Sequence, residues 1–246
     1  MLQNVLPEKA AIVIDLQKNL NKPIFLNDLV CNKKKVFIVV PDGVSATVYE
    51  HDSLQEIVFL LGAKSTLNFF SFITASGTKK IEIICEQEGA QANINGIYLF
   101  SENETAFLRT RQRHTARKTK TNLFLRGLLS GCSKVNHHGE IFIDKQACNV
   151  EAAQNNKTML LSPDARVISC PELNVLNKDV RCSHGSAVGQ MDKKQLFYLC
   201  SRGMQEDVAR RLLLHTFLTL PFVQVGDRSF KKKFEQIISK KLQEIE

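Results

Sequence analysis

Short alternations of apolar and polar residues fill the chain between residues 33 and 190, where helical periodicity is almost absent. Strand-like runs such as KVFIVV (35–40), EIVFLL (56–61) and NGIYLFS (95–101) are separated by polar turns. No helix of ten or more residues fits between these runs. A doubly wound α/β fold needs crossover helices and is therefore disfavoured. An antiparallel sandwich and a solenoid of stacked rungs remain.

A recurring turn favours the solenoid. In each copy a turn residue is followed by a small residue that opens a two-residue alternation: DGVSATV (42–48), LGAKSTL (61–67), EGAQANI (88–94) and PDARVIS (163–169). Alternate side chains of a strand point to one face. The side chains that would point inward are small, as a narrow interior near a corner requires. We therefore predict an all-β fold, a parallel β-helix.

The pattern changes at Met191 from alternation to helical spacing. Asp192 is expected to cap a short helix that Gly203 ends. A second helix is predicted over QEDVARRLLLHTFLTL (205–220), with an apolar stripe of Val208, Leu212, Leu213, Thr216, Phe217 and Leu220. A third, in DRSFKKKFEQIISKKLQEIE (227–246), places on one face Phe230, Phe234, Ile237, Ile238, Leu242 and Ile245. The chain divides into a short N-terminal segment (1–32), a β-helix core (33–190) and a helical C-terminal region (191–246).

Composition and the N-terminal sequence indicate a protein of the cytoplasm. The chain has 246 residues, 43% of them hydrophobic, and 7 cysteines without a dense framework spacing. Its start lacks a basic segment followed by a long apolar core, and no run of 18 apolar residues occurs. We expect no signal peptide, no membrane span and reduced thiols.

Charge suggests one alternative function. The formal net charge is +8, and the segment RTRQRHTARKTK (109–120) carries six cations and no acid. Such a run can bind phosphates, so a nucleic-acid-binding module is an alternative. No aromatic residue interleaves the cations to stack on bases, which disfavours it.

A carbohydrate-active β-helix enzyme is a weaker alternative. It would need acids gathered on one face of the solenoid. The acids here, such as Asp144, Glu151 and Asp164, are scattered among different predicted rungs.

The stretch DVRCSHGSAVGQMD (179–192) has the strongest appearance of chemistry. Cys182 and His184 are two residues apart, so on a strand they would share a face. Thiolate and imidazole are both good iron ligands, but two ligands do not complete a site. A Cys–His nucleophile would need an oriented base and an oxyanion hole, and nothing nearby in the sequence supplies them.

Three segments carry a family resemblance: ANINGIYLF (92–100) after a QEGA turn, LFLRGLLSG (123–131), and the block from Ala152 to Met204. The last block contains Cys-Ser-His-Gly and Leu-Phe-Tyr-Leu-x-Ser-Arg-Gly, a specific combination. From about Lys35 to Phe222 the chain resembles the SufB/SufD family of iron–sulfur cluster assembly proteins, and its SufD branch most closely.

This resemblance implies a right-handed parallel β-helix and a scaffold role in cluster assembly rather than a reaction. It implies pairing with a SufB-like protein through the β-helix edge, with Cys182 and His184 at that interface. The resemblance implies no permanently bound cofactor. It implies a transient iron–sulfur cluster or iron, with His184 as a metal ligand. Whether the partner is a SufB-like protein or, in isolation, a second copy of this chain stays open.

The resemblance also implies that a SufC-like ATPase docks on the C-terminal helices. We expect four residues of this region to contribute: Arg202, Met204, Arg210 and Arg211. The chain has no P-loop, because GCSKVNHHG (131–139) lacks the Gly-Lys-Ser/Thr ending. The ATPase activity is therefore expected in the partner, and this chain is expected to be no enzyme.

Overall fold

The computed structural model describes residues 12–16, 23–29, 35–52, 56–223, 225 and 227–245. Two seven-stranded sheets face each other. Sheet A contains β1 (Ile12–Asp15), β3 (Lys35–Val40), β5 (Glu56–Leu61), β7 (Gly77–Cys85), β9 (Thr105–His114), β11 (Lys134–Ile143) and β13 (Arg166–Val175). Sheet B contains β2 (Ile24–Phe25), β4 (Ser45–His51), β6 (Thr66–Ile73), β8 (Gln91–Phe100), β10 (Lys120–Leu129), β12 (Val150–Leu160) and β14 (Val180–Gly189).

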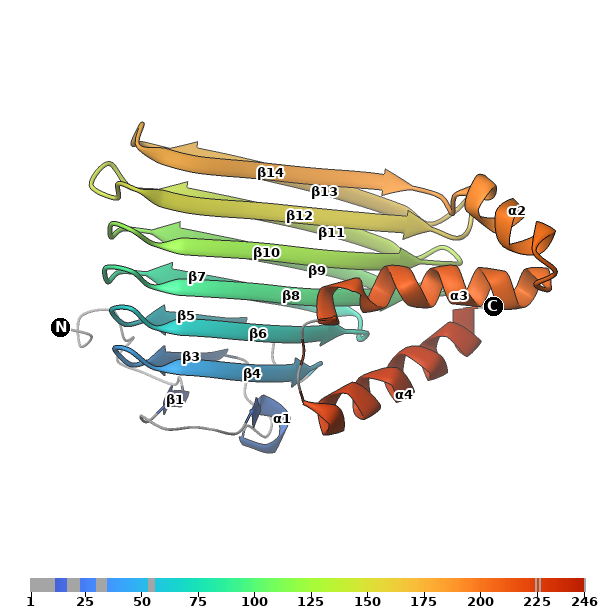
Figure 1. The fold of residues 1–246 in the computed structure, drawn as a ribbon, viewed down its shortest axis with the longest axis horizontal. Helices are drawn as coiled ribbons and strands as arrows, with labels where there is room; N and C mark the ends of the chain where they lie inside the picture. The colour runs from blue at the N-terminus through green and yellow to red at the C-terminus, as the bar shows by residue number, and fades with distance from the viewer. Residues whose placement is uncertain are drawn as a thin grey trace.

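The chain alternates between the two sheets, and every strand pairs in parallel with the strand two places along the chain. In Figure 1 the near strands run to the right and the far strands to the left while the chain rises. This coil is right-handed, as expected for parallel crossovers. The predicted right-handed parallel β-helix is confirmed, because each rung is one strand from each sheet.

The recurring turn forms a corner that repeats up the stack. Five residues there have positive φ angles: Gly43, Lys64, Gly89, Lys118 and Asn149. The backbone N–H of each donates to a carbonyl in the next rung, for example Lys64 to Glu88 and Lys118 to Cys148, both at 2.9 Å. The small residues that follow this corner are buried as predicted, including Ala46 and Ala92. Ala165 is buried too, but the copy of the turn that contains it lies at the opposite corner, between β12 and β13. The turn therefore sets both the direction and the spacing of the rungs.

The interior changes character along the stack. In the lower solenoid, β3 to β8, it is dominated by large apolar side chains such as Phe59, Phe69 and Ile83, and a buried ion pair joins Lys79 to Glu50 at 2.5 Å. In the upper solenoid, β9 to β14, apolar residues are mixed with buried polar ones such as Gln112, His137, Gln154, Asn156 and Thr158.

The described residues also form the helices α1 (Leu26–Leu29), α2 (Lys193–Ser201), α3 (Glu206–Thr219) and α4 (Arg228–Ile245) and the 3-10 helix η2 (Leu220–Phe222). Figure 1 shows α3 and α4 in front of sheet B, near the ends of its strands. The third predicted helix is confirmed, since Phe230, Phe234, Ile238 and Leu242 of α4 are buried against the outer face of sheet B.

The stripe predicted for α3 is wrong in part. Four of its members are exposed: Val208, Leu212, Thr216 and Leu220. The helix instead buries a neighbouring face, formed by Ala209, Leu214 and Leu218. Three consecutive leucines (212–214) allow two apolar faces on this helix, and the sheet that it packs on selects between them.

The N-terminal segment contributes two strands to the solenoid where the structure describes it. β1 pairs with β3, and β2 pairs with β4. The sequence AAIVIDLQKNL (10–20) is compatible with a short helix or a strand, and apart from residues 12–16 this stretch lies outside the described residues. In the described segments, no helix has the length and apolarity needed to span a membrane.

Candidate functional site

Cys182 and His184 lie on β14, the last strand of sheet B. Cys182 pairs in register with Ala152, and His184 with Gln154. Because both of those residues are buried in the interior, Cys182 and His184 share the inward face of their strand, as predicted. No described strand lies beyond β14, so His184 is exposed at this end of the solenoid. We call this end, formed by β13 and β14, the open end.

The two residues differ in their surroundings. Cys182 is half-buried and packs against the apolar cluster of Ile141, Ile143 and Val150. Burial raises the pKa of its thiol, and a backbone hydrogen bond involving Ala152 opposes that rise in part. A thiol with a raised pKa is a weaker nucleophile at neutral pH. His184 is solvent-accessible and is the more available ligand of the pair.

Within the described part of the chain, no group of three or more His, Cys, Asp or Glu side chains is arranged to hold a metal ion. The geometry therefore brings Cys182 and His184 onto one face without completing a ligand set.

A hydrogen-bonded chain of polar side chains runs beside the site. Asn156 donates to Nδ1 of His137 at 3.0 Å and to Ser169 Oγ at 3.2 Å, and Ser169 contacts the Ser186 hydroxyl of β14 at 2.8 Å. Nδ1 of His137 accepts, so Nε2 carries the proton and donates to Thr110 Oγ1 at 3.0 Å. Burial, with a smaller contribution from His138, lowers the pKa of His137 to about 4. His137 is therefore a neutral interior imidazole that links the two sheets.

From the sequence, a solvated turn is the expected setting of the adjacent residues His137 and His138, and this expectation is wrong. Both lie within β11, with His137 buried in the interior and His138 on the outer face, 3.0 Å from a carboxylate oxygen of Glu172. Gly139 is the next inward-facing position of β11, and the side chain of Gln154 fills the space beside it. A Cβ on Gly139 would overlap that carboxamide.

The open end carries exposed apolar side chains that sequence reasoning missed. Leu173 and Val188 lie on its two strands, Ile168 on the outer face of β13, and Leu176 just after it; all are exposed. Pro171 lies within β13, a position that strands tolerate at the edge of a sheet. An unpaired strand edge with exposed apolar residues is a template for pairing with another chain. The sequence does contain a signal for this surface: the strands of residues 166–189 have apolar inward positions, and the pattern changes to helical spacing directly after them.

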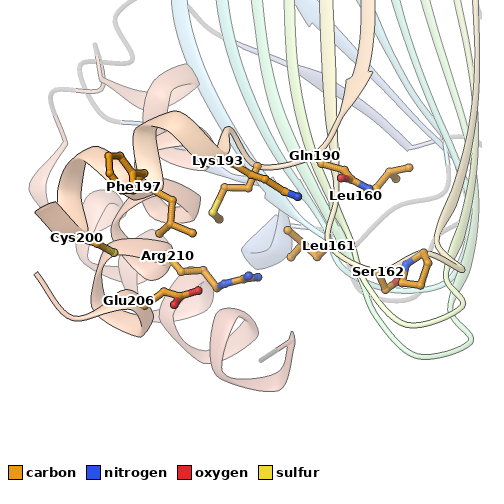
Figure 2. A pocket seen from close by; sticks show the side chains of 12 residues that line it. Leu160, Leu161, Ser162, Gln190, Lys193, Phe197, Cys200, Glu206 and Arg210 are labelled. Atoms are coloured by element: carbon orange, nitrogen blue, oxygen red, sulfur yellow. The ribbon is translucent and has the colours of Figure 1, made fainter.

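A cavity of about 560 Å³ separates the end of sheet B from α2 and α3. Figure 2 shows Arg210 and Glu206 of α3 facing this cavity opposite the α2 residues Lys193, Phe197 and Cys200. Leu160, Leu161 and Ser162 at the end of β12 form its other wall. Its mixed apolar and charged lining suits a protein segment.

Of the predicted docking residues, only Arg210 lines this cavity. Arg202 is exposed, and its guanidinium lies 5.4 Å from the ring centroid of Tyr198. Met204 is half-buried, and Arg211 pairs with Asp207 one helical turn away at 2.6 Å. Nearby, Phe197 and Tyr198 are exposed, and no residue of α2 is buried. The two helices thus present a surface that the solenoid does not cover.

Comparison with known proteins identifies the family. A family model described as the SUF system FeS cluster assembly, SufBD core domain, matches residues 53–217, about two thirds of the chain. The chain belongs to the SufBD family.

Individual SufBD relatives agree. The chain is 26% identical over 155 residues to the iron–sulfur cluster assembly protein SufD of Escherichia coli, a match that covers 63% of this chain and 37% of that protein. It is 31% identical over 137 residues to a SufBD family protein of Mycobacterium leprae, covering 52% and 35%. The chain thus matches only about a third of the length of these relatives.

The basic segment of this SufBD chain is largely neutralised. Five of its six cations form ion pairs with carboxylates: Arg109–Glu140, Arg111–Glu82, Arg117–Glu88, Lys118–Glu88 and Lys120–Glu151. Residues 109–114 lie in β9 and residue 120 opens β10, so the cations are spread over two sheets and a corner. Interspersed acids weaken the potential that attracts phosphates, which removes support from a nucleic-acid interface.

Two of the acids considered for a carbohydrate-active site, Asp144 and Asp164, are far apart. Asp144 follows β11 and Asp164 follows β12, and these strands end on opposite sides of the solenoid (Figure 1). A ten-residue strand spans about 33 Å, whereas paired catalytic carboxylates must lie within about 10 Å. The third acid, Glu151, pairs with Lys120 at 2.7 Å.

Proposed function

We propose that this chain is a SufD-like, non-catalytic scaffold subunit of an iron–sulfur cluster assembly complex. In this proposal its open end pairs with a SufB-like protein, and its C-terminal helices dock a SufC-like ATPase. Membership of the SufBD family supports the general role. The open end, with an exposed histidine and exposed apolar residues at an unpaired edge, is the observation that carries the pairing.

A partner at the open end would cover the last rung of the solenoid. Strands of a second solenoid would extend sheets A and B and cover Leu173 and Val188, which a terminal rung otherwise leaves in water. His184 would then lie between two chains. Further ligands from the partner would complete a site for a transient cluster or for iron, because imidazole and thiolate ligands suit iron.

The ATPase has a separate surface. The cavity between the end of sheet B and the helices α2 and α3 suits a helix laid into a groove, as do the exposed side chains of Phe197, Tyr198 and Arg210. Since this surface is built from the C-terminal helices rather than from β13 and β14, the two partners would bind independently.

Co-expression with SufB-like and SufC-like proteins tests the proposal. Wild-type chain and His184→Ala are compared by size-exclusion chromatography with light scattering and by visible absorbance of the assembled cluster. The expected result is an intact complex with His184→Ala and loss of cluster absorbance. His138→Ala, a histidine on the outer face of sheet A, is the matched control and should leave both readouts unchanged.

Two outcomes would contradict the proposal. The first is failure of the wild-type chain to bind either partner, with self-association as a homodimer in their place. The second is normal cluster absorbance in the His184→Ala complex, which would remove the chemical role of this residue.

A further inference from the structure

Two glutamines lie in the interior where neighbouring rungs carry aliphatic residues. Gln112 is 1% exposed and Gln154 is 3% exposed. Gln112 is stacked between Ile83 and Ile141 in sheet A, and Gln154 is stacked on Leu123 in sheet B. An aliphatic residue at either position would continue the apolar stack, so the two carboxamides need a separate explanation.

Neither carboxamide has a hydrogen-bond partner in the described part of the chain. Nε2 and Oε1 of both Gln112 and Gln154 are buried and unpaired. A buried amide without a partner is strongly unfavourable, and buried polar groups in native proteins are bonded to protein or to ordered water. His137 offers no spare nitrogen, because Asn156 and Thr110 already bond to both of its ring nitrogens.

Gln112 on β9 and Gln154 on β12 face the interior from opposite sheets and from neighbouring rungs. Gln154 extends from sheet B across to sheet A, where its Nε2 occupies the space that a Cβ on Gly139 would need. Gly139 is two residues before Ile141, the residue stacked on Gln112. The missing side chain at Gly139 thus makes room for a polar group between the sheets.

We propose that ordered water binds between the sheets at this level, held by the carboxamides of Gln112 and Gln154. Each carboxamide supplies two donors and an acceptor, and a buried water is stable when it has two to four polar partners. Gln154 lies one rung below His184, with which it pairs in register, and Gln112 on β9 lies one rung lower. The open end, one rung away, gives water its route of entry. The inference concerns the free chain and does not depend on the proposed function.

A high-resolution crystal structure of the chain tests this site. Electron-density peaks are expected within about 3.2 Å of the Nε2 and Oε1 atoms of both glutamines. Gln154→Met, which keeps the length of the side chain but removes its polar atoms, should lose the peaks that adjoin residue 154. Gln236→Met, on the exposed face of α4, is the control and should keep them all.

Direct bonding of Gln112 to Gln154 or to the backbone, with no water between, would overturn the proposal. A solution measurement covers the case in which Gln154→Met does not fold. In the wild-type chain, the side-chain amide protons of both glutamines should show nuclear Overhauser cross-peaks to water, and their absence would equally overturn it.

Discussion

The lower and upper halves of the solenoid share one backbone design but are stabilised differently. Both use the same corner, with a positive-φ residue whose N–H donates to the next rung. The lower interior is filled by residues such as Phe59 and Phe69, whereas the upper interior contains His137 and Asn156 in a hydrogen-bonded chain. The lower half is therefore expected to gain most of its stability from apolar burial, and the upper half depends more on complete hydrogen bonding.

This division matches the arrangement of the surfaces. The helical region covers the outer face of the lower and middle rungs of sheet B, where Tyr49, Phe70 and Phe72 pack against Phe222 and Phe230. The open end at the top is uncovered. A repeat fold needs both ends closed, so a half that is polar inside and uncovered at its end is suited to receive a partner.

The largest expected effect is a cavity in the lower interior. Phe69 is fully buried, and its ring centroid lies 4.8 Å from that of Phe59. Phe69→Ala should reduce the free energy of unfolding by about 3–5 kcal/mol, through lost burial and the cavity left behind. Urea unfolding followed by circular dichroism measures this. A loss below about 1 kcal/mol would show that the lower interior is not the main source of stability.

The next largest effect is the pH dependence of stability that His137 gives to the upper half. Burial lowers the pKa of His137 to about 4, below the value of about 6.5 expected in the unfolded chain. Between pH 6.5 and pH 4 the unfolded state binds the extra proton. The stability contributed by neutral His137 is therefore complete above pH 6.5 and is lost as the pH falls toward 4.

The comparison of two adjacent histidines measures this contribution. The difference in unfolding free energy between pH 7.5 and pH 4.5 should be smaller by roughly 2–3 kcal/mol in His137→Gln than in the wild type. His138→Gln, on the outer face, should keep most of the wild-type difference, because His138 makes only the smaller contribution to the lowered pKa of His137. Equal pH dependence of the two variants would contradict a neutral buried His137. His114, whose pKa burial also lowers to about 4, contributes equally in all three chains.

A smaller change in stability is expected from glycine substitutions at the same corner position in the two halves. Lys64 in the lower corner has a φ of 51° and Asn149 in the upper corner a φ of 53°. Glycine adopts positive φ without strain, and asparagine tolerates it better than lysine does. Lys64→Gly should raise the free energy of unfolding by about 0.5–1 kcal/mol, and Asn149→Gly should raise it by less. Destabilisation by Lys64→Gly would mean that its side chain packing outweighs the backbone strain.

The smallest effect on stability is expected at the open end. Val188→Glu should change the unfolding free energy of the isolated chain by no more than about 0.5 kcal/mol, because the side chain is exposed. It should nevertheless abolish binding of the SufB-like partner in a co-purification assay. Phe107→Glu, at an exposed position on the outer face of β9, is the control and should bind normally. Loss of binding in both variants would remove the distinction between the two surfaces.

The sequence was sufficient for the features that depend on local rules. Alternation and the recurring turn predicted the strands and the small inward residues, and the spacing of Phe230, Phe234 and Ile238 predicted the buried face of α4. The predicted cap is also found, since Asp192 Oδ1 accepts from the N–H of Lys194 at 2.8 Å.

Features that depend on a distant neighbour were missed. The buried face of α3 is chosen by the outer residues of sheet B, so three consecutive leucines did not reveal it. His137 became an interior residue because Asn156, from the facing sheet, bonds to its ring. Cys182 and His184 share one face of β14, but the described part of the chain brings no third ligand to them.

Hydrogen–deuterium exchange on the co-expressed complex tests the central claim most directly. Free and partner-bound chains are compared for the backbone amides of residues 166–189, which cover β13 and β14, with the lower strands as an internal reference. The account predicts strong slowing of exchange in β13 and β14 when the SufB-like partner binds, and little change in β3 to β6. Unchanged exchange in β13 and β14 within a stable complex would contradict the assignment of the open end as the pairing surface.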